Sequence, residues 1–251
     1  MFDILRIRAR QGYQAIPDIK KAVIIPQFRG LPEITVADVG DGFTADAVCP
    51  TGAIGRAPLS VDLGKCVFCG DCERECKNSE IKFTNYHKFA VDSAEKLVIT
   101  KETGRDFLEK NAIKSRAEIH KIFGRSLKLR QVSAGGCNGC ELELNACSNV
   151  NFDMGRFGID FVASPRHADG IVITGPITKN MAPALKDTYD AVPEPKIIIL
   201  AGSCALSGGV FADSEALNRT FLAEHKVDLY VPGCPVHPLT FVNGVLRFIG
   251  S

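Results

Sequence analysis

The fold is decided by the stretch KIIILAG at residues 196–202, a largely β-branched apolar run that ends in a glycine. Similar apolar runs, each followed by a loop with glycine or proline, cover Phe157–Ser164, Gly170–Gly175 and Val227–Gly233. Such runs predict buried strands. The segments between them, Thr178–Asp190 and Ser214–Glu224, have helical spacing. Strands that alternate with helices predict a parallel α/β sheet, whose ligands gather at the carboxyl ends of the strands.

Composition narrows the class of protein. The 251 residues carry 30 Lys plus Arg against 29 Asp plus Glu, a formal net charge of +1, which argues against nucleic acid as a partner. No run reaches the roughly 20 apolar residues that span a bilayer, and Met1–Arg10 shows no signal peptide. We therefore expect a cytoplasmic, reducing location, in which the ten cysteines serve metal binding or catalysis rather than disulfides.

A dense cysteine motif, CVFCGDCEREC, occupies residues 66–76. Cys66, Cys69 and Cys72 stand at three-residue intervals, and Cys76 follows. This spacing matches the bacterial ferredoxin run C-x2-C-x2-C-x3-C-P, which binds an iron–sulfur cubane. Zinc sites usually use paired knuckles instead of a triple, so the motif favours a 4Fe-4S cluster.

The fourth ligand of this cluster has two candidates. CPTGAI at residues 49–54 resembles the tail of an earlier copy of the motif, whose other cysteines would stand where the chain has Val39, Gly42 and Ala45. In two-cluster ferredoxins the fourth cysteine ligates the other cluster. By that crossover rule Cys49 completes the set of Cys66, Cys69 and Cys72, and Cys76 is left without a cluster. The alternative is local ligation by Cys76.

A second set of cysteines lies in the other half of the chain. Cys137 and Cys140 form a C-x2-C pair in the glycine-rich turn GGCNGCE at residues 135–141. Cys204 and Cys234 each follow a predicted strand. Because the carboxyl ends of neighbouring parallel strands converge, we expect these four thiols to form one site. Structural zinc or inert buried thiols are the alternatives.

These motifs resemble known proteins. GGCNGCE, together with SPRHAD at 164–169, GP at 175–176 and VPGCP at 231–235, resembles the small subunit of energy-converting, complex-I-related NiFe hydrogenases of the formate-hydrogenlyase type. That subunit is related to the 20 kDa subunit of complex I. FRGLPE at 28–33 and the cysteine triple resemble the ferredoxin-like subunit of the same complexes, normally a separate chain with two cubanes. The chain thus looks like a fusion that has lost one cubane.

The resemblance and the pattern along the chain together predict three parts. Residues 1–90 would form an α+β ferredoxin-like 4Fe-4S domain, and residues 91–125 a helical linker. In this linker region, the charged, periodic segments Ser93–Lys101 and Arg105–Leu129 predict short helices. Residues 126–251 would form a flavodoxin-like α/β domain that holds the second 4Fe-4S cluster.

The resemblance also implies a function. The chain would be the electron-transfer subunit of a membrane-associated NiFe hydrogenase complex, with the Ni–Fe site on a partner large subunit. Two 4Fe-4S clusters would connect that site to ferredoxin or another low-potential donor. Other subunits, including a membrane arm, would hold the chain at the cytoplasmic membrane. The C-terminal domain has no second C-x2-C pair, so this chain would not bind the nickel itself.

Two alternatives to the hydrogenase stay open. The complex I form of the second site has adjacent cysteines, whereas Cys137 and Cys140 are separated as in hydrogenases. A complex-I-like quinone oxidoreductase subunit without hydrogenase activity is therefore one alternative. A structural zinc protein is the other.

Two further features have competing interpretations. Glu143 follows the Cys137–Cys140 pair and is the candidate catalytic residue, as a proton carrier at the large-subunit interface; alternatively, Glu141 and Glu143 are acids favoured by the helix dipole. The N-terminus alternates apolar and basic residues. It could lie on a membrane surface or a hydrophobic partner, or pack into the core.

Overall fold

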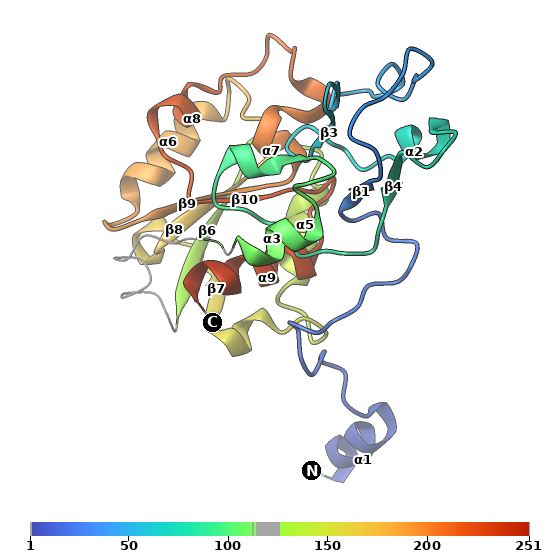
Figure 1. Cartoon of the computed structure of the whole chain (residues 1–251). Helices are drawn as coiled ribbons and strands as arrows, with labels where there is room; N and C mark the ends of the chain where they lie inside the picture. The colour runs from blue at the N-terminus through green and yellow to red at the C-terminus, as the bar shows by residue number, and fades with distance from the viewer. Residues whose placement is uncertain (1, 112, 114–125, 251) are drawn as a thin grey trace.

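A computed structural model describes residues 2–111, 113 and 126–250 of the chain. Its largest sheet has five parallel strands in the order β10-β9-β8-β6-β7 (Figure 1). These strands are β6 (Leu127–Ser133), β7 (Ile159–Phe161), β8 (Gly170–Thr174), β9 (Ile197–Ala201) and β10 (Leu229–Val231). The predicted parallel α/β sheet is confirmed, and its central strands β8 and β9 are buried at every position, as their β-branched sequences predict.

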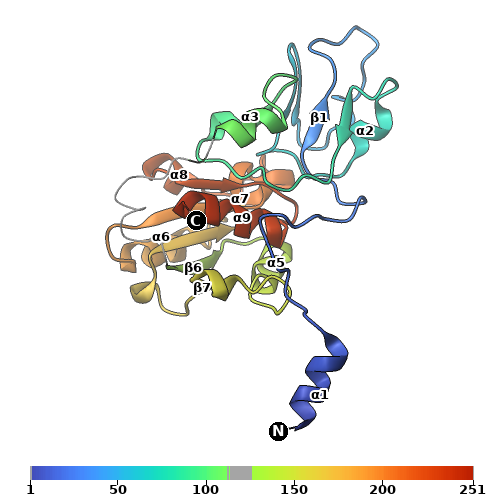
Figure 2. The same cartoon turned by 60° about the horizontal axis from the view of Figure 1, so that its bottom comes forward.

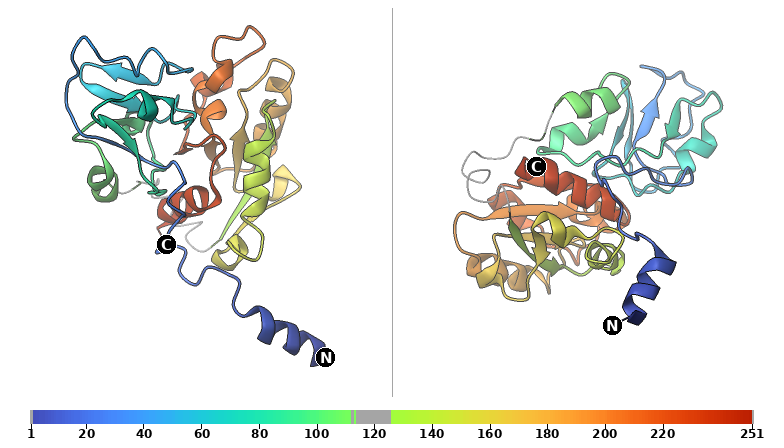
Figure 3. Two further views of the ribbon diagram at one scale, coloured as in Figure 1. Left: turned by 90° about the vertical axis from the view of Figure 1, so that its right-hand side faces the viewer. Right: turned by 90° about the horizontal axis from the view of Figure 1, so that it is seen from below.

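Helices cover both faces of this sheet. On one face lie α5 (Gly139–Ala146) and α9 (Pro238–Ile249), and on the other lie α6 (Ala182–Ala191) and α8 (Thr220–Glu224) (Figures 1 and 3). Alternate residues of β9 point to the two layers: Ile197 and Ile199 pack with the α5 and α9 side, and Ile198 and Leu200 with the α6 and α8 side. The short helix α7 (Ser203–Ser207) follows β9 directly. Single 3-10 turns are η2 (Met154–Phe157), η3 (Pro165–His167) and η4 (Gly209–Phe211).

The N-terminal half builds two small antiparallel sheets. One pairs β1 (Pro32–Ile34) with β4 (Ile81–Phe83), and the other has the order β2-β3-β5, with β2 (Ile54–Arg56), β3 (Leu59–Asp62) and β5 (Val98–Ile99). Besides the N-terminal helix, this half contains the helices α2 (Asp71–Glu75) and α3 (Arg105–Lys110) and the 3-10 turn η1 (Ala94–Leu97). These elements share a core of their own and lie together beside the larger sheet (Figure 2). The ferredoxin-like fold and the domain boundaries stay predictions.

The helical prediction for Ser93–Lys101 and Arg105–Leu129 is only partly right. Helical turns occur at η1 and α3, but β5 and the start of β6 are strands. Leu127 and Leu129 are fully buried and alternate with more exposed Lys128 and Arg130, which is the period of a strand. Residues 112 and 114–125, which the prediction also covered, lie outside the described residues.

The N-terminal helix α1 (Phe2–Gln11) projects away from the rest of the protein (Figures 1 and 3). The exposed fractions of Ile4, Leu5 and Ile7 are 71%, 62% and 53%, so the alternative in which this segment packs into the core is wrong. Docking of α1 on a membrane or a partner stays a prediction. Among the described residues, no helix combines the length and apolar character that crossing a bilayer requires.

Candidate functional site

Four cysteines of the N-terminal half surround one cavity. Cys66, Cys69 and Cys72 come from the loop between β3 and α2 and from the first turn of α2, and Cys49 comes from the turn before β2. We call Cys49, Cys66, Cys69 and Cys72 the first thiol set. Its cavity has apolar walls that include Val61 and Phe83, and Cys76 is not among its lining residues. The structure thus brings Cys49 to the cysteine triple, and its role as the fourth ligand stays a prediction.

Backbone N–H groups point at sulfur atoms of the first thiol set. The N–H of Ala53 donates to Cys49 Sγ at 3.2 Å, and the N–H of Phe68 donates to Cys66 Sγ at 3.3 Å. Phe68 has a φ of 54°, a left-handed conformation that turns the loop around the sulfur atoms. Hydrogen bonds of this kind stabilise negative charge on sulfur.

Two thiols of this set, Cys66 and Cys72, are buried and resist ionisation. Burial raises the pKa of Cys66 to about 12, and Cys72, Cys49 and Cys69 raise it as well. Burial also raises the pKa of Cys72 to about 12, with further contributions from Cys69, Cys76 and Cys49. A bound cationic metal centre favours ionisation of these thiols, because the thiolate is the form that binds metal. In the described part of the chain, no three His, Cys, Asp or Glu side chains are arranged to hold a single metal ion.

Cys76 lies at the carboxyl end of α2 and lines a different hollow. Val39 and Gly42 line the same hollow, and they occupy two of the positions where the sequence predicts lost ligands. Ala45, the third such position, is buried in the core of the N-terminal half. Burial and the neighbouring Glu80 raise the pKa of Cys76. The same hollow is therefore lined by Cys76 and by two positions of the earlier motif copy that has lost its cysteines.

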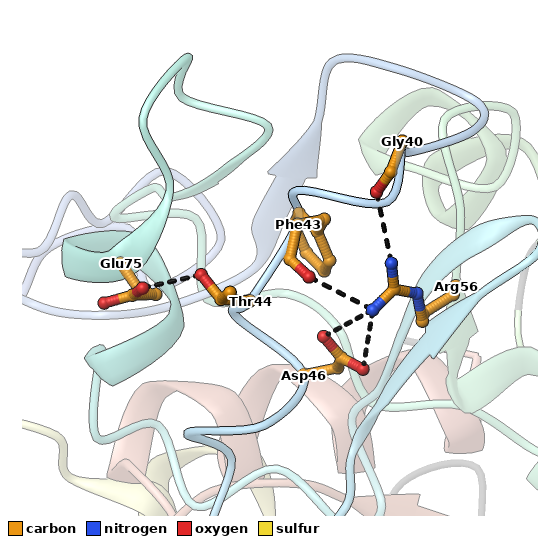
Figure 4. A network of polar contacts seen from close by, with 6 residues as sticks. All are labelled: Gly40, Phe43, Thr44, Asp46, Arg56 and Glu75. Carbon is orange, nitrogen blue, oxygen red and sulfur yellow. Dashed lines mark hydrogen bonds and ion pairs between the residues drawn. The ribbon is translucent and has the colours of Figure 1, made fainter.

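Polar contacts fix the loop that carries the lost positions (Figure 4). The guanidinium of Arg56 donates to the carbonyls of Gly40 and Phe43, each at 3.1 Å, and pairs with Asp46 at 3.3 Å. On the other side of the loop, Thr44 Oγ1 donates to Glu75 of α2 at 2.6 Å. These contacts connect the loop to β2 and to α2.

Restoring the lost cysteines is expected to add a cluster. In the triple variant Val39→Cys/Gly42→Cys/Ala45→Cys, two new thiols line the hollow with Cys76, and the third follows Thr44, another of its lining residues, so iron is expected to rise by about four per chain. Iron analysis of the chain prepared without oxygen measures this gain. Adding Cys76→Ser to the triple variant is the control and lowers the gain. Iron at the parent level in the triple variant would contradict the crossover register.

The second thiol set consists of Cys137, Cys140, Cys204 and Cys234. Cys137 and Cys140 follow β6, Cys204 follows β9, and Cys234 follows β10. All four therefore lie at the carboxyl edge of the parallel sheet, where ligands are expected. Cys137 and Cys234 are exposed, whereas Cys140 and Cys204 are half-buried.

Glycines make room for the sulfur atoms of the second thiol set. Gly202 has a φ of 91°, and a Cβ at this position would lie 2.4 Å from Cys140 Sγ. At Gly209 a Cβ would lie 3.1 Å from Cys204 Sγ. Any side chain at Gly202 would displace the thiol of Cys140, so the glycine is required by close approach as well as by conformation.

The members of the second thiol set also act on one another. The pKa of Cys204 is raised to about 11, chiefly by burial and also by Cys234 and Cys137. Burial raises the pKa of Cys140 to about 12, with smaller contributions that include Glu141, Cys204 and Cys234. The four thiols that the sequence grouped are thus neighbours in the structure.

The two thiol sets are close to each other. Ser203, next to Cys204, donates its hydroxyl to the carbonyl of Cys66 at 2.6 Å. Burial raises the pKa of Cys234, which is raised further by Cys137 and by Cys69 of the first thiol set. The sequence did not reveal this contact, since Ser203 lies far along the chain from Cys66 and its hydroxyl binds a carbonyl, which carries no residue-specific signal.

Glu143 faces a cavity between the two halves of the chain. Arg29, Phe68, Cys234 and His237 line the same cavity. Burial raises the pKa of Glu143. Burial also lowers the pKa of His237 to about 4, and its Nδ1 accepts from the backbone N–H of Leu239 at 3.1 Å. Glu143 can therefore exchange protons nearer neutral pH than an exposed glutamate.

Glu141 and Cys147, near the second thiol set, have structural roles. Glu141 is buried and accepts from Ser133 Oγ at 2.7 Å and from Thr174 Oγ1 at 2.6 Å, which ties α5 to β6 and β8. Cys147 is fully buried in the core beside α5 and α9. Neither side chain is free for chemistry at the surface.

Comparison with known proteins adds a family and several relatives. Residues 137–248 match the family described as NADH ubiquinone oxidoreductase, 20 kDa subunit. A Pyrococcus furiosus protein named "probable membrane-bound hydrogenase subunit mbhJ" is 38% identical over 59% of this chain and 86% of its own length. An NADH-quinone oxidoreductase subunit of Heliobacterium modesticaldum is 42% identical over 57% of this chain and 81% of its own. Formate hydrogenlyase subunit 7 of Escherichia coli is 41% identical over 54% of this chain and 53% of its own.

Proposed function

Because the chain belongs to the family of the NADH ubiquinone oxidoreductase 20 kDa subunit, whose members are oxidoreductase subunits, we propose that it is the electron-transfer subunit of a membrane-associated NiFe hydrogenase complex. The proposed reaction of the whole complex is 2H⁺ + 2e⁻ ⇌ H₂. The reaction centre would lie on a partner large subunit, and this chain would connect it to a low-potential donor such as ferredoxin.

The chemistry of the two thiol sets supports two 4Fe-4S clusters. Each set offers four thiols, and neighbouring thiols of the set raise the pKa of Cys66 in the first and of Cys204 in the second. Backbone N–H groups approach sulfur in the first set, and glycines make room for sulfur in the second. When bound, such clusters carry single electrons. In the first thiol set we assign Cys49, Cys66, Cys69 and Cys72 as the ligands, and in the second Cys137, Cys140, Cys204 and Cys234.

One observation carries the proposal: the two thiol sets meet across the hydrogen bond from Ser203 to the carbonyl of Cys66. Ser203 precedes a ligand of the second set, and Cys66 is a ligand of the first. The contact holds the two loops together, which supports a short electron path from the N-terminal half to the carboxyl edge of the parallel sheet.

The exposed side of the second thiol set suits a partner chain. Cys137 is exposed. Leu142 follows Cys140 along the chain, and Val210 and Phe211 follow Cys204. These three apolar side chains are exposed as well. Exposed apolar side chains on two segments that carry ligands support an interface on this side. We propose that the large subunit covers this side, with Glu143 as a proton carrier toward it. Other complex subunits, including a membrane arm, would anchor the chain to the membrane.

Purification with partners tests the proposal. A tagged chain isolated from its own cells without oxygen is expected to bring down a large subunit that contains nickel, identified by mass spectrometry and metal analysis. A nickel-free partner that lacks the nickel-binding cysteine pairs would contradict the hydrogenase assignment. The second candidate, a quinone oxidoreductase subunit, draws support from the similarity to the NADH-quinone oxidoreductase relative, and it predicts that nickel-free partner.

A further inference from the structure

The helix that carries Cys204 is capped by an arginine from a distant loop. The guanidinium of Arg219 donates to the carbonyls of Cys204 at 3.1 Å, Ala205 at 2.8 Å and Leu206 at 2.9 Å. It also donates to the carbonyl of Pro176, after β8, at 3.0 Å. These contacts use most of the five N–H groups of the side chain. Arg219 thus satisfies the carbonyls of Ala205 and Leu206 in the last turn of α7, and it shares the carbonyl of Cys204 with the backbone N–H of Gly208.

Hydrogen bonds also hold the amino-terminal end of α7 in place. The backbone N–H of Ser203 donates to the carbonyl of Gly233 at 2.9 Å, and its hydroxyl reaches the carbonyl of Cys66. Cys204 therefore stands on a single short helix that is held at its start by the Cys66 and Cys234 loops and at its end by Arg219. Movement of this helix would move the thiol.

The positive charge of Arg219 has no carboxylate to neutralise it among the described residues. Arg219 is half-buried, and its four hydrogen bonds all go to main-chain carbonyls. Carbonyl oxygens are dipoles, so they stabilise the guanidinium without cancelling its charge. An arginine in a protein stays protonated. The second thiol set therefore has a fixed, half-buried positive charge beside Cys204.

We propose that Arg219 is a positioning residue that holds Cys204 in place and raises the reduction potential of the cluster bound by the second thiol set. This inference rests on the proposed function, since it requires that cluster. Reduction adds a negative charge, and a nearby positive charge in a medium of low dielectric constant stabilises the reduced form. The guanidinium binds carbonyls of α7 and of the loop after β8, on the side of the second thiol set, so the effect is expected at the second cluster.

Three variants test the inference by redox titration monitored by electron paramagnetic resonance. Arg219→Met removes the charge and keeps much of the length of the side chain. The ratio of reduced to oxidised second cluster, at the parent's midpoint potential, is expected to fall about tenfold, which is ~59 mV for one electron. Arg219→Lys keeps the charge and is expected to stay close to the parent. The matched control is Arg247→Met, because Arg247 also donates to two carbonyls, those of Lys88 and Leu108, which belong to neither thiol set.

Iron content separates the possible failures. A parent chain without a second cluster would refute the proposed function and not only this inference. If the parent has both clusters and Arg219→Met keeps them with an unshifted second potential, the inference alone is wrong. If Arg219→Met loses the second cluster, the potential of that cluster is measured in Arg219→Lys instead. The lysine variant keeps the charge, so a tenfold fall in its ratio of reduced to oxidised second cluster would overturn the role of charge. Loss of that cluster in both variants, but not in Arg247→Met, would limit Arg219 to assembly and would also overturn the proposal.

Discussion

Cys49→Ser is expected to remove about half of the iron from the chain, whereas Cys76→Ser is expected to leave the iron content unchanged. The reason is geometric. Cys49 lines the same cavity as Cys66, Cys69 and Cys72, while Cys76 lines a separate hollow with Val39 and Gly42. Loss of one of four thiolates leaves one iron of a cubane without its ligand, and serine is a poor substitute for the soft thiolate. Iron and acid-labile sulfide analysis of the two variants measures the difference.

Cys49 and Cys76 both lie near Cys72, so the two variants compare two neighbouring candidate ligands. Cys76 acts on Cys72 of the first thiol set, so local ligation by Cys76 has some support in the geometry. We favour Cys49 because it lines the cavity and its sulfur accepts the N–H of Ala53. A result in which Cys76→Ser halves the iron and Cys49→Ser does not would reverse the assignment.

Glu143→Gln is expected to lower hydrogen turnover of the assembled complex about a hundredfold, the usual effect of removing a proton-transferring side chain. Burial raises the pKa of Glu143, so the carboxyl group can both take up and release protons nearer neutral pH. Glutamine has the same shape and cannot do either. The iron content and the reduction potentials of both clusters should stay close to those of the parent, which separates proton transfer from electron transfer.

Glu141→Gln provides the matched control on the same helix. Its side-chain oxygen can still accept from Ser133 and Thr174, so α5 keeps its place. The substitution is the same as in Glu143→Gln, but turnover is expected to stay within a few-fold of the parent. Turnover that is retained in Glu143→Gln, or lost equally in both variants, would remove Glu143 from the proton path.

Much of the C-terminal fold could be predicted because its central strands are buried on both faces. KIIILAG became β9, and Gly170–Gly175 became β8, since a strand covered on both sides has such continuous apolar sequence. The strand β6 was missed at Leu127–Leu129 because charged residues alternate with its buried leucines. Lys128 forms an ion pair with Asp160, its partner residue on the neighbouring strand β7, which explains how the charge is tolerated.

The candidate site, like the fold, could be predicted from the sequence only in part. Spacing grouped Cys66, Cys69 and Cys72, and the crossover rule of duplicated ferredoxin motifs added Cys49. The second set was grouped because parallel strands end at one edge. The contacts of Ser203 and Arg219 were not predictable, since both side chains bind backbone carbonyls that any residue would supply. Only the folded chain places these donors beside the thiols.

One chain is expected to hold two 4Fe-4S clusters, and metal analysis of the anaerobically purified protein tests this most directly. Iron, acid-labile sulfide and zinc are measured per chain, together with the visible absorption. We predict about eight irons and about eight sulfides per chain, with little zinc and a brown colour. About four irons would leave only one cluster, and a colourless protein that contains zinc would contradict electron transfer altogether.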